Sequence, residues 1–116
     1  MTGVGTFRDL DVYRRSVVLG DSLHLSVGAW DSFARWTVGV QLVRAADSVG
    51  ANIAEAAGRS TDADQRRFLL VARASALELE HWIDRAHARY LPIPENAAHE
   101  AARLGRMLNG LLRRRG

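Results

Sequence analysis

The sequence contains no cysteine, no lysine and only two prolines, and no apolar run in it approaches the roughly 18 residues of a transmembrane helix. Without cysteine the chain forms no disulfide, no thiolate zinc site and no cysteine nucleophile. The N-terminal segment also lacks the charged-then-apolar pattern of a secretion signal. These absences argue against a disulfide-stabilised secreted domain and against a membrane protein. They predict one cytoplasmic domain over residues 1–116.

All 16 basic residues are arginine, and they are concentrated toward the C-terminus. Residues 1–100 hold 11 arginines and 13 acidic residues, whereas residues 101–116 hold five arginines and no acidic residue. The formal net charge of +3 therefore arises in the last segment. Guanidinium groups bind phosphate in a bidentate way, but cations also stabilise the negative end of a helix dipole. This segment is therefore either a phosphate-binding surface or a solvated helix end.

Apolar residues recur at helical spacing in four segments, and no segment alternates in the manner of a strand. The predicted helices cover residues 9–27, 37–58, 61–90 and 94–115. Thr37 is placed to cap the second helix and Gly58 to end it. Ser60 or Thr61 is placed to cap the third helix, and Pro94 or Glu95 to open the fourth. Because short connections favour antiparallel neighbours, the sequence predicts an all-α protein, an antiparallel up-down-up-down four-helix bundle.

The connection before the second predicted helix carries several large apolar side chains. Trp30, Phe33 and Trp36 fall within it, and we expect these rings to pack over the bundle instead of facing solvent. In the later helices, the helical period places Phe68 and Leu111 among the residues that face the core.

One face of the second predicted helix is polar. Its members recur every three or four residues and form a continuous stripe: Gln41, Arg44, Ser48, Asn52, Glu55 and Arg59. In an antiparallel hairpin with the third helix, residues whose numbers sum to about 122 lie at the same height. We therefore predict an ion pair between Arg44 and Glu78. A second predicted ion pair joins Glu55 to Arg67, and together the two pairs fix the register of the hairpin. The alternative is that the polar stripe is a solvated face.

The third predicted helix has a second apolar stripe on the side opposite the core. Leu70 and Leu77 lie seven residues apart there, beside Arg66 and Arg73. A second stripe indicates a second partner, so we predict a subunit interface at the two leucines. Isolated exposed leucines, which are common in monomeric proteins, are the alternative.

The outer face of the last predicted helix is basic. The candidate nucleic-acid contacts on this helix and at its end are Arg103, Arg106, Arg113, Arg114 and Arg115. Arginine contacts to phosphate give salt-dependent affinity for nucleic acid. The face lacks the interleaved aromatic residues of a single-strand platform, so a solvated face is the alternative.

Motifs of catalysis and metal binding are missing from the sequence. Glu78 and His81 have the Glu-x-x-His spacing of di-iron bundles, but the second copy and the further carboxylates that such a site requires are absent. The sequence also has no glycine-rich phosphate loop, no nucleophile elbow and no His-Glu-x-x-His motif. We therefore predict a protein that is not an enzyme and binds no metal or cofactor.

The run from Gln41 to Arg59, with Asn-Ile-Ala-Glu at residues 52–55, resembles the central motif of a bacterial family of four-helix bundle proteins encoded in 23S ribosomal RNA intervening sequences. Residues 7–13, 67–80 and 106–112 are similar to the opening, the third-helix motif and the ending of that family. The chain departs from the family pattern in having alanine at position 56 after the motif glutamate, where glycine is usual. It also has Trp-Asp at residues 30–31, where the family has Phe-Pro.

The resemblance implies a non-enzymatic bundle that assembles as a homopentamer. Similar bundles include the accessory proteins of diversity-generating retroelements, which bind nucleic acid and partner a reverse transcriptase. We therefore consider two hypotheses for the function of this protein. The first is an oligomeric bundle that binds RNA through its basic last helix. The second is a protein–protein adaptor, for example a reverse transcriptase partner, that acts through the surface of the assembled bundle.

Overall fold

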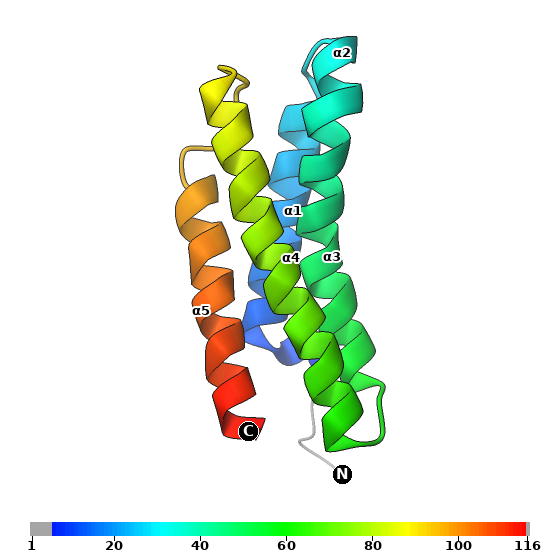
Figure 1. Cartoon of the computed structure of the whole chain (residues 1–116). Helices are drawn as coiled ribbons and strands as arrows, with labels where there is room; N and C mark the ends of the chain where they lie inside the picture. The colour runs from blue at the N-terminus through cyan, green and yellow to red at the C-terminus, as the bar shows by residue number, and fades with distance from the viewer. Residues whose placement is uncertain (1–5, 116) are drawn as a thin grey trace.

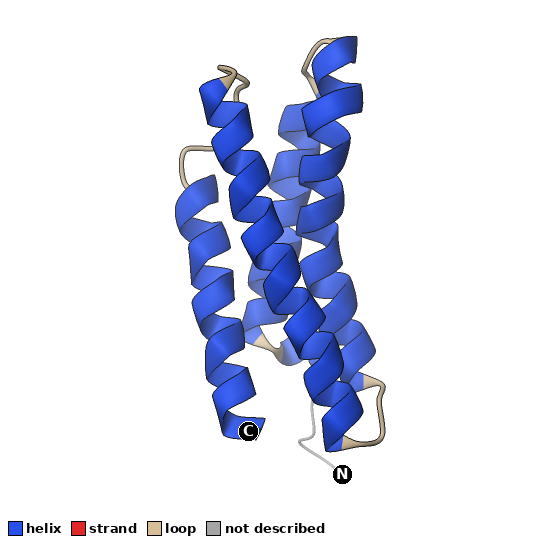
Figure 2. Cartoon of the chain, viewed as in Figure 1, coloured by secondary structure: helices blue, strands red, loops and turns tan. Residues whose placement is uncertain are grey.

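The computed structural model describes residues 6–115, and it describes side chains as far as residue 114. Within this range the chain forms helices and no strands (Figure 2). The elements in chain order are the 3-10 turn η1 (Phe7–Asp9), α1 (Asp11–Gly28), α2 (Ser32–Ala34), the π-helical turn η2 (Arg35–Gly39), α3 (Val40–Ala57), α4 (Asp62–Ala88) and α5 (Ala97–Arg115). The four long helices run alternately up and down and pack side by side (Figure 1). The prediction of an all-α four-helix bundle is confirmed.

The second helix of the bundle begins earlier than predicted. Asp31 caps it, because its carboxylate accepts a hydrogen bond from the backbone N–H of Ala34 at 3.0 Å. The helical backbone then continues from α2 through η2 into α3. Thr37 is therefore not a cap, and its hydroxyl donates a hydrogen bond to the carbonyl oxygen of Phe33, 2.7 Å away. Asp31 was the stronger capping signal in the sequence.

The other predicted helix ends agree more closely with the structure. Gly58 ends α3, and the Thr61 hydroxyl accepts a hydrogen bond from the backbone N–H of Asp64 at the start of α4. After α4, Tyr90 takes a left-handed backbone conformation with φ of 56°, which is common just beyond a helix. The following helix, α5, begins at Ala97 instead of at Pro94 or Glu95.

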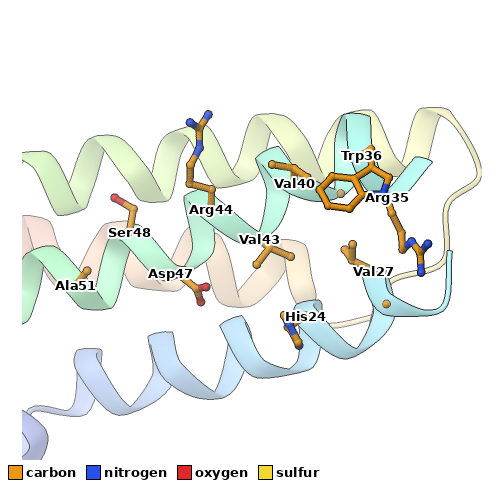
Figure 3. Close-up of a pocket in the computed structure, with 12 residues that line it drawn as sticks. His24, Val27, Arg35, Trp36, Val40, Val43, Arg44, Asp47, Ser48 and Ala51 are labelled. Atoms are coloured by element: carbon orange, nitrogen blue, oxygen red, sulfur yellow. The ribbon is translucent and has the colours of Figure 1, made fainter. Parts of the chain in front are cut away.

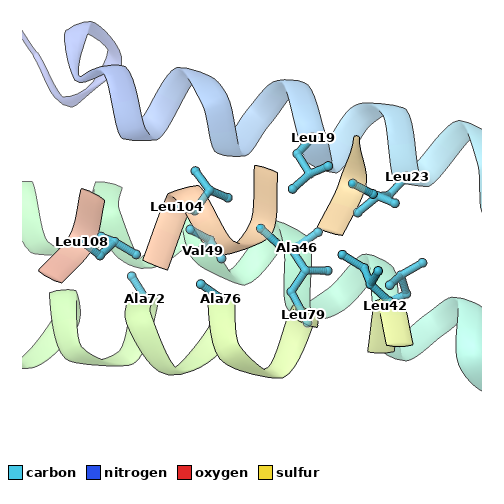
Figure 4. Packing of buried hydrophobic residues seen from close by; sticks show 14 of the residues in the cluster. Leu19, Leu23, Leu42, Ala46, Val49, Ala72, Ala76, Leu79, Leu104 and Leu108 are labelled. Carbon is cyan, nitrogen blue, oxygen red and sulfur yellow. The ribbon is translucent and has the colours of Figure 1, made fainter. Parts of the chain in front are cut away.

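One apolar face of each long helix builds the core (Figure 4). The largest fully buried side chains are Leu23, Leu42, Val49, Ile53, Leu79, Ile83, Leu104 and Leu108. Small buried residues such as Ala72 and Ala76 on α4 lie opposite these larger side chains and allow the helices to interdigitate. Among the described residues, no helix combines the length and the apolar composition needed to cross a membrane.

Two predicted core positions are wrong by one residue. Leu69 and Leu112 are buried, each 4% exposed, whereas Phe68 and Leu111 are only partly buried at the edge of the core. In both pairs the neighbouring residues are apolar, and a shift of one residue turns the inward direction by about 100°. The helical period alone does not choose between such neighbours.

The aromatic residues before α3 divide into one buried and two exposed rings. Trp30 is buried, and its indole N–H donates a hydrogen bond to the carbonyl oxygen of Pro92 at 2.8 Å, which ties this end of the bundle to the connection before α5. Phe33 and Trp36 are 80% and 73% exposed. The expectation that all three rings pack over the bundle is therefore wrong for Phe33 and Trp36, because the early helix start turns both outward.

Candidate nucleic-acid interface

The predicted ion pair between Arg44 of α3 and Glu78 of α4 is not formed. Arg44 instead donates a hydrogen bond to the side-chain oxygen of Gln41 on its own helix. Glu78 accepts a hydrogen bond from the indole N–H of Trp82, one turn further along α4, at 3.1 Å. Partners three or four residues away on the same helix are reached without any constraint on how two helices face each other.

The second predicted pair, between Glu55 and Arg67, is also not formed. Glu55 pairs with Arg59 at 2.6 Å, and Arg67 pairs with Asp64 at 3.5 Å. The guanidinium groups of Arg59 and Arg67 both lie over the ring of Phe68. The central carbon of Arg59 is 4.5 Å from the ring centroid, and that of Arg67 is 4.4 Å from it. The contact between Arg59 and Phe68 joins the end of α3 to α4 as a cation–π interaction.

A neutral hydrogen-bond network links α3 to α4 in the middle of the polar stripe. The hydroxyls of Ser48 and Ser75 lie 2.8 Å apart, and Ser75 is only 7% exposed. The side-chain amide of Asn52 donates to both the hydroxyl and the carbonyl oxygen of Ser48. Sequence reasoning placed Ser48 and Asn52 in the stripe but missed Ser75, whose position beside Ala72 and Ala76 on the buried face of α4 was the available signal.

Four arginines of α5 have no acidic partner among the described side chains. Arg106, Arg113 and Arg114 are exposed, and Arg103 is partly buried. Within the part of the chain that the structure describes, none of these four forms an ion pair. The fifth candidate, Arg115, lies outside the residues whose side chains are described. The C-terminal half of α5 therefore presents free guanidinium groups to solvent.

The N-terminal part of α5 has a different electrostatic character. Its Glu100 pairs with Arg15 of α1 at 3.3 Å, and Arg15 also pairs with Asp11 at 3.3 Å. The hydrogen bond from Arg15 to Asp11, with further attraction from both carboxylates, raises the pKa of Arg15 above its ordinary value. The positive surface of α5 therefore begins beyond Glu100, at Arg103.

Two arginines of α4 extend this positive surface across the seam between the helices. Arg66 donates a hydrogen bond to the carbonyl oxygen of Leu112 at 3.0 Å, and Arg73 donates one to the side-chain oxygen of Asn109 at 3.2 Å. Neither arginine forms an ion pair among the described residues. The sequence indicated Arg66 and Arg73 only as neighbours of Leu70 and Leu77. Arg66 and Arg73 lie seven residues apart, and antiparallel packing places them at the height of the basic end of α5. This was the signal that could have identified them as part of the positive surface.

The two leucines of the predicted subunit interface differ in exposure. Leu77 is 59% exposed on the outer side of α4, whereas Leu70 is partly buried against the core. Val71 lies nearby on the same helix and is 42% exposed. The predicted interface at Leu70 and Leu77 stays a prediction, centred on the more exposed Leu77.

An open groove of about 870 Å³ lies on the outer face of α3 beside the end of α1 (Figure 3). Its apolar lining includes Val27, Trp36, Val40, Val43 and Ala51. The polar lining residues are His24, Arg35, Arg44, Asp47 and Ser48. Sequence reasoning missed this groove because it depends on the outward position of Trp36.

The Glu-x-x-His spacing at Glu78 and His81 does not gather a ligand set. The ring of His81 packs edge-on against Trp82 at a centroid distance of 4.8 Å, and Glu78 bonds to the indole of the same tryptophan. Throughout residues 6–114, no three side chains of the metal-binding types come together.

The fold and its surface define a class: a small, wholly helical bundle with a basic end and an apolar groove on one side. The chain belongs to the 23S rRNA-intervening sequence protein family, whose model matches residues 8–110. This match confirms the resemblance recognised in the sequence. A comparison with curated proteins finds no significant match. The matched range includes Arg103 and Arg106 of the basic helix, whereas Arg113, Arg114 and Arg115 follow it.

Proposed function

We propose that this protein is a non-enzymatic, nucleic-acid-binding bundle whose ligand is RNA, and that the part of α5 from Arg103 onward is its contact surface. The observation that carries the proposal is the unpaired state of Arg103, Arg106, Arg113 and Arg114 among the described residues. A carboxylate partner neutralises the charge of an arginine and occupies part of its donor fork, whereas an unpaired arginine keeps its full charge and its whole donor fork for phosphate. Membership of the 23S rRNA-intervening sequence protein family makes ribosomal RNA the first ligand to test.

The test replaces Arg103, Arg106 and Arg114 together with glutamine and measures RNA affinity over a range of salt concentrations. Each lost phosphate contact lowers the slope of log affinity against log salt by about 0.7 for a single strand. The triple variant is therefore expected to bind RNA at least tenfold more weakly and with a slope lower by about 2.

The matched control removes the same charge elsewhere, by replacing Arg8, Arg14 and Arg89 with glutamine. All three are exposed and lie outside α5. If the control loses as much affinity as the α5 variant, the binding depends on total charge and the assignment to α5 is refuted. Unchanged affinity in the α5 variant refutes it as well.

The groove favours a second function, self-association, because each copy carries two different apolar surfaces. One is the groove with Trp36, and the other is the outer side of α4 with Leu77. Exposed aromatic rings at the edge of an apolar groove are typical of protein interfaces. We propose that the groove of one copy receives the α4 face of the next. A contact between unlike surfaces gives a ring when the rotation from one copy to the next divides a full turn, as a homopentamer requires.

Light scattering on single and mixed variants tests this arrangement. Trp36→Gln and Leu77→Gln are each expected to give monomers, and an equal mixture of the two is expected to form dimers through the one intact contact. Leu25→Gln, at a residue 76% exposed on α1, is expected to leave the assembly intact. A monomeric wild-type protein overturns self-association and leaves the groove to a different protein partner, such as a reverse transcriptase.

A further inference from the structure

A small hollow lies in the seam between α4 and α5. It has a volume of about 210 Å³ and is lined by Arg66, Arg73, Asn109, Leu112 and Arg113. We propose that this hollow binds a phosphate group, with the three arginines as its cationic ligands. That this phosphate belongs to a nucleic-acid backbone rests on the proposed function.

The electrostatics of the hollow favour an anion. Three guanidinium groups line it, and its lining includes no carboxylate. In the described part of the chain, Arg66, Arg73 and Arg113 form no ion pair. Arginine stays protonated at every physiological pH, so these like charges repel one another unless an anion lies between them. A bound phosphate supplies the missing negative charge.

The two arginines of α4 are held in place but keep free donors. Arg66 uses one terminal nitrogen to reach the carbonyl oxygen of Leu112 at 3.0 Å, and Arg73 uses one to reach Asn109 at 3.2 Å. A guanidinium carries five N–H donors, so each group retains donors for a ligand. Because the hydrogen bonds to α5 already restrict both side chains, less conformational entropy is lost when a ligand binds.

A purely structural role accounts for only part of this arrangement. Arg66 bonds to a carbonyl near the C-terminal end of α5, where backbone acceptors lack helical partners and the helix dipole attracts cations. That role explains Arg66, but it requires neither Arg73 nor Arg113 at the same hollow. A tetrahedral phosphate, with several oxygens that each accept hydrogen bonds, matches donors that arrive from two helices.

The first arm of the test titrates inorganic phosphate into the protein and follows backbone amide resonances. The wild-type protein is expected to show saturable shifts confined to residues 66–73 and 109–113, measured against chloride at the same ionic strength. Arg73→Gln and Arg113→Gln are each expected to weaken this binding about tenfold. Arg89→Gln removes the same charge at the far end of α4 and is expected to leave the shifts unchanged.

The second arm identifies the source of the phosphate with an RNA oligonucleotide. If a backbone phosphate occupies the hollow, Arg73→Gln lowers the salt slope of RNA binding by about 0.7 to 1, while Arg89→Gln does not. If inorganic phosphate binds and the RNA slope is unchanged, the hollow is a site for free phosphate. If wild-type resonances show no localised shifts and the RNA slope is also unchanged in Arg73→Gln, the proposal is overturned.

Two further variants separate this proposal from instability and from the proposed function. Arg73→Lys keeps the charge but loses the planar fork, so it is expected to fold normally and to bind phosphate more weakly than wild type. The triple variant of Arg103, Arg106 and Arg114 leaves all three ligands of the hollow intact. Undiminished RNA affinity in that variant refutes the contacts assigned to those three arginines, whereas phosphate binding there still supports the hollow.

Discussion

Replacing Gly39 with alanine tests how closely the π-helical turn η2 packs against α1. A Cβ atom at Gly39 would lie 2.6 Å from a methyl carbon of Val27 and 3.2 Å from the carbonyl oxygen of Ala34. Val27 and Ala34 are both buried, so neither moves without disturbing its own neighbours. Alanine is favoured over glycine in a helix by up to about 1 kcal/mol, whereas overpacking a core costs about 1–3 kcal/mol. We expect Gly39→Ala to lower the free energy of unfolding by about 1–2 kcal/mol.

The same change at Gly105 provides the matched control. Gly105 lies inside α5, and a Cβ atom there would have no neighbour within 4 Å. Only the helix propensity then changes, so we expect Gly105→Ala to raise the free energy of unfolding by about 0.5–1 kcal/mol. The two variants should therefore shift the melting temperature in opposite directions, by about 4 °C for each kcal/mol in a chain of this size.

Thermal and urea denaturation followed by far-ultraviolet circular dichroism measures both effects. All samples need the same protein concentration, because self-association would make apparent stability depend on it. Equal stabilisation by the two alanines would refute the close contact between η2 and α1. Destabilisation by Gly105→Ala would show that α5 is more crowded at this point than the structure indicates.

The remaining predictions concern single hydrogen bonds. Asp31→Ala removes the observed helix cap and should lower the free energy of unfolding by about 1 kcal/mol, whereas Thr37→Ala should change it by less than about 0.5 kcal/mol. Urea denaturation measures both changes, and the reverse order would favour the cap that the sequence predicts at Thr37. Ser75→Ala removes the buried partner of Ser48 between α3 and α4 and should lower the free energy of unfolding by about 1 kcal/mol. Ser60→Ala, at an exposed turn, should leave it almost unchanged. Equal losses in the two variants would contradict a stabilising contact at Ser75.

The sequence was informative wherever a local rule decides the structure. Helical spacing identified all four long helices, and the signals at Gly58 and Thr61 located the turn between α3 and α4. Of the residues that carry the family resemblance, all but Phe7, Leu111 and Leu112 lie within the range that the family model matches. These features depend on contacts between residues a few positions apart, which can be read along the chain.

The sequence misled wherever two local signals competed. The sequence analysis placed the cap at Thr37, whereas the structure has it at Asp31, and Phe33 and Trp36 face solvent. Leu69 replaces Phe68 in the core because adjacent apolar residues satisfy the helical period equally well. In each case the packing of a neighbouring helix selects one of two locally equivalent choices.

The sequence by itself determined the class of this protein: a helical bundle without cysteine, whose excess positive charge lies at its C-terminal end. Only the tertiary structure decided how the helices face one another. It left Arg44 and Glu78 bonded within their own helices, and it brought Arg66 and Arg73 to α5. The physical reason is geometric. Helical period and chain order give the height of a residue in the bundle, whereas its partner depends on the rotation of each helix about its axis, which the packing of the whole core sets.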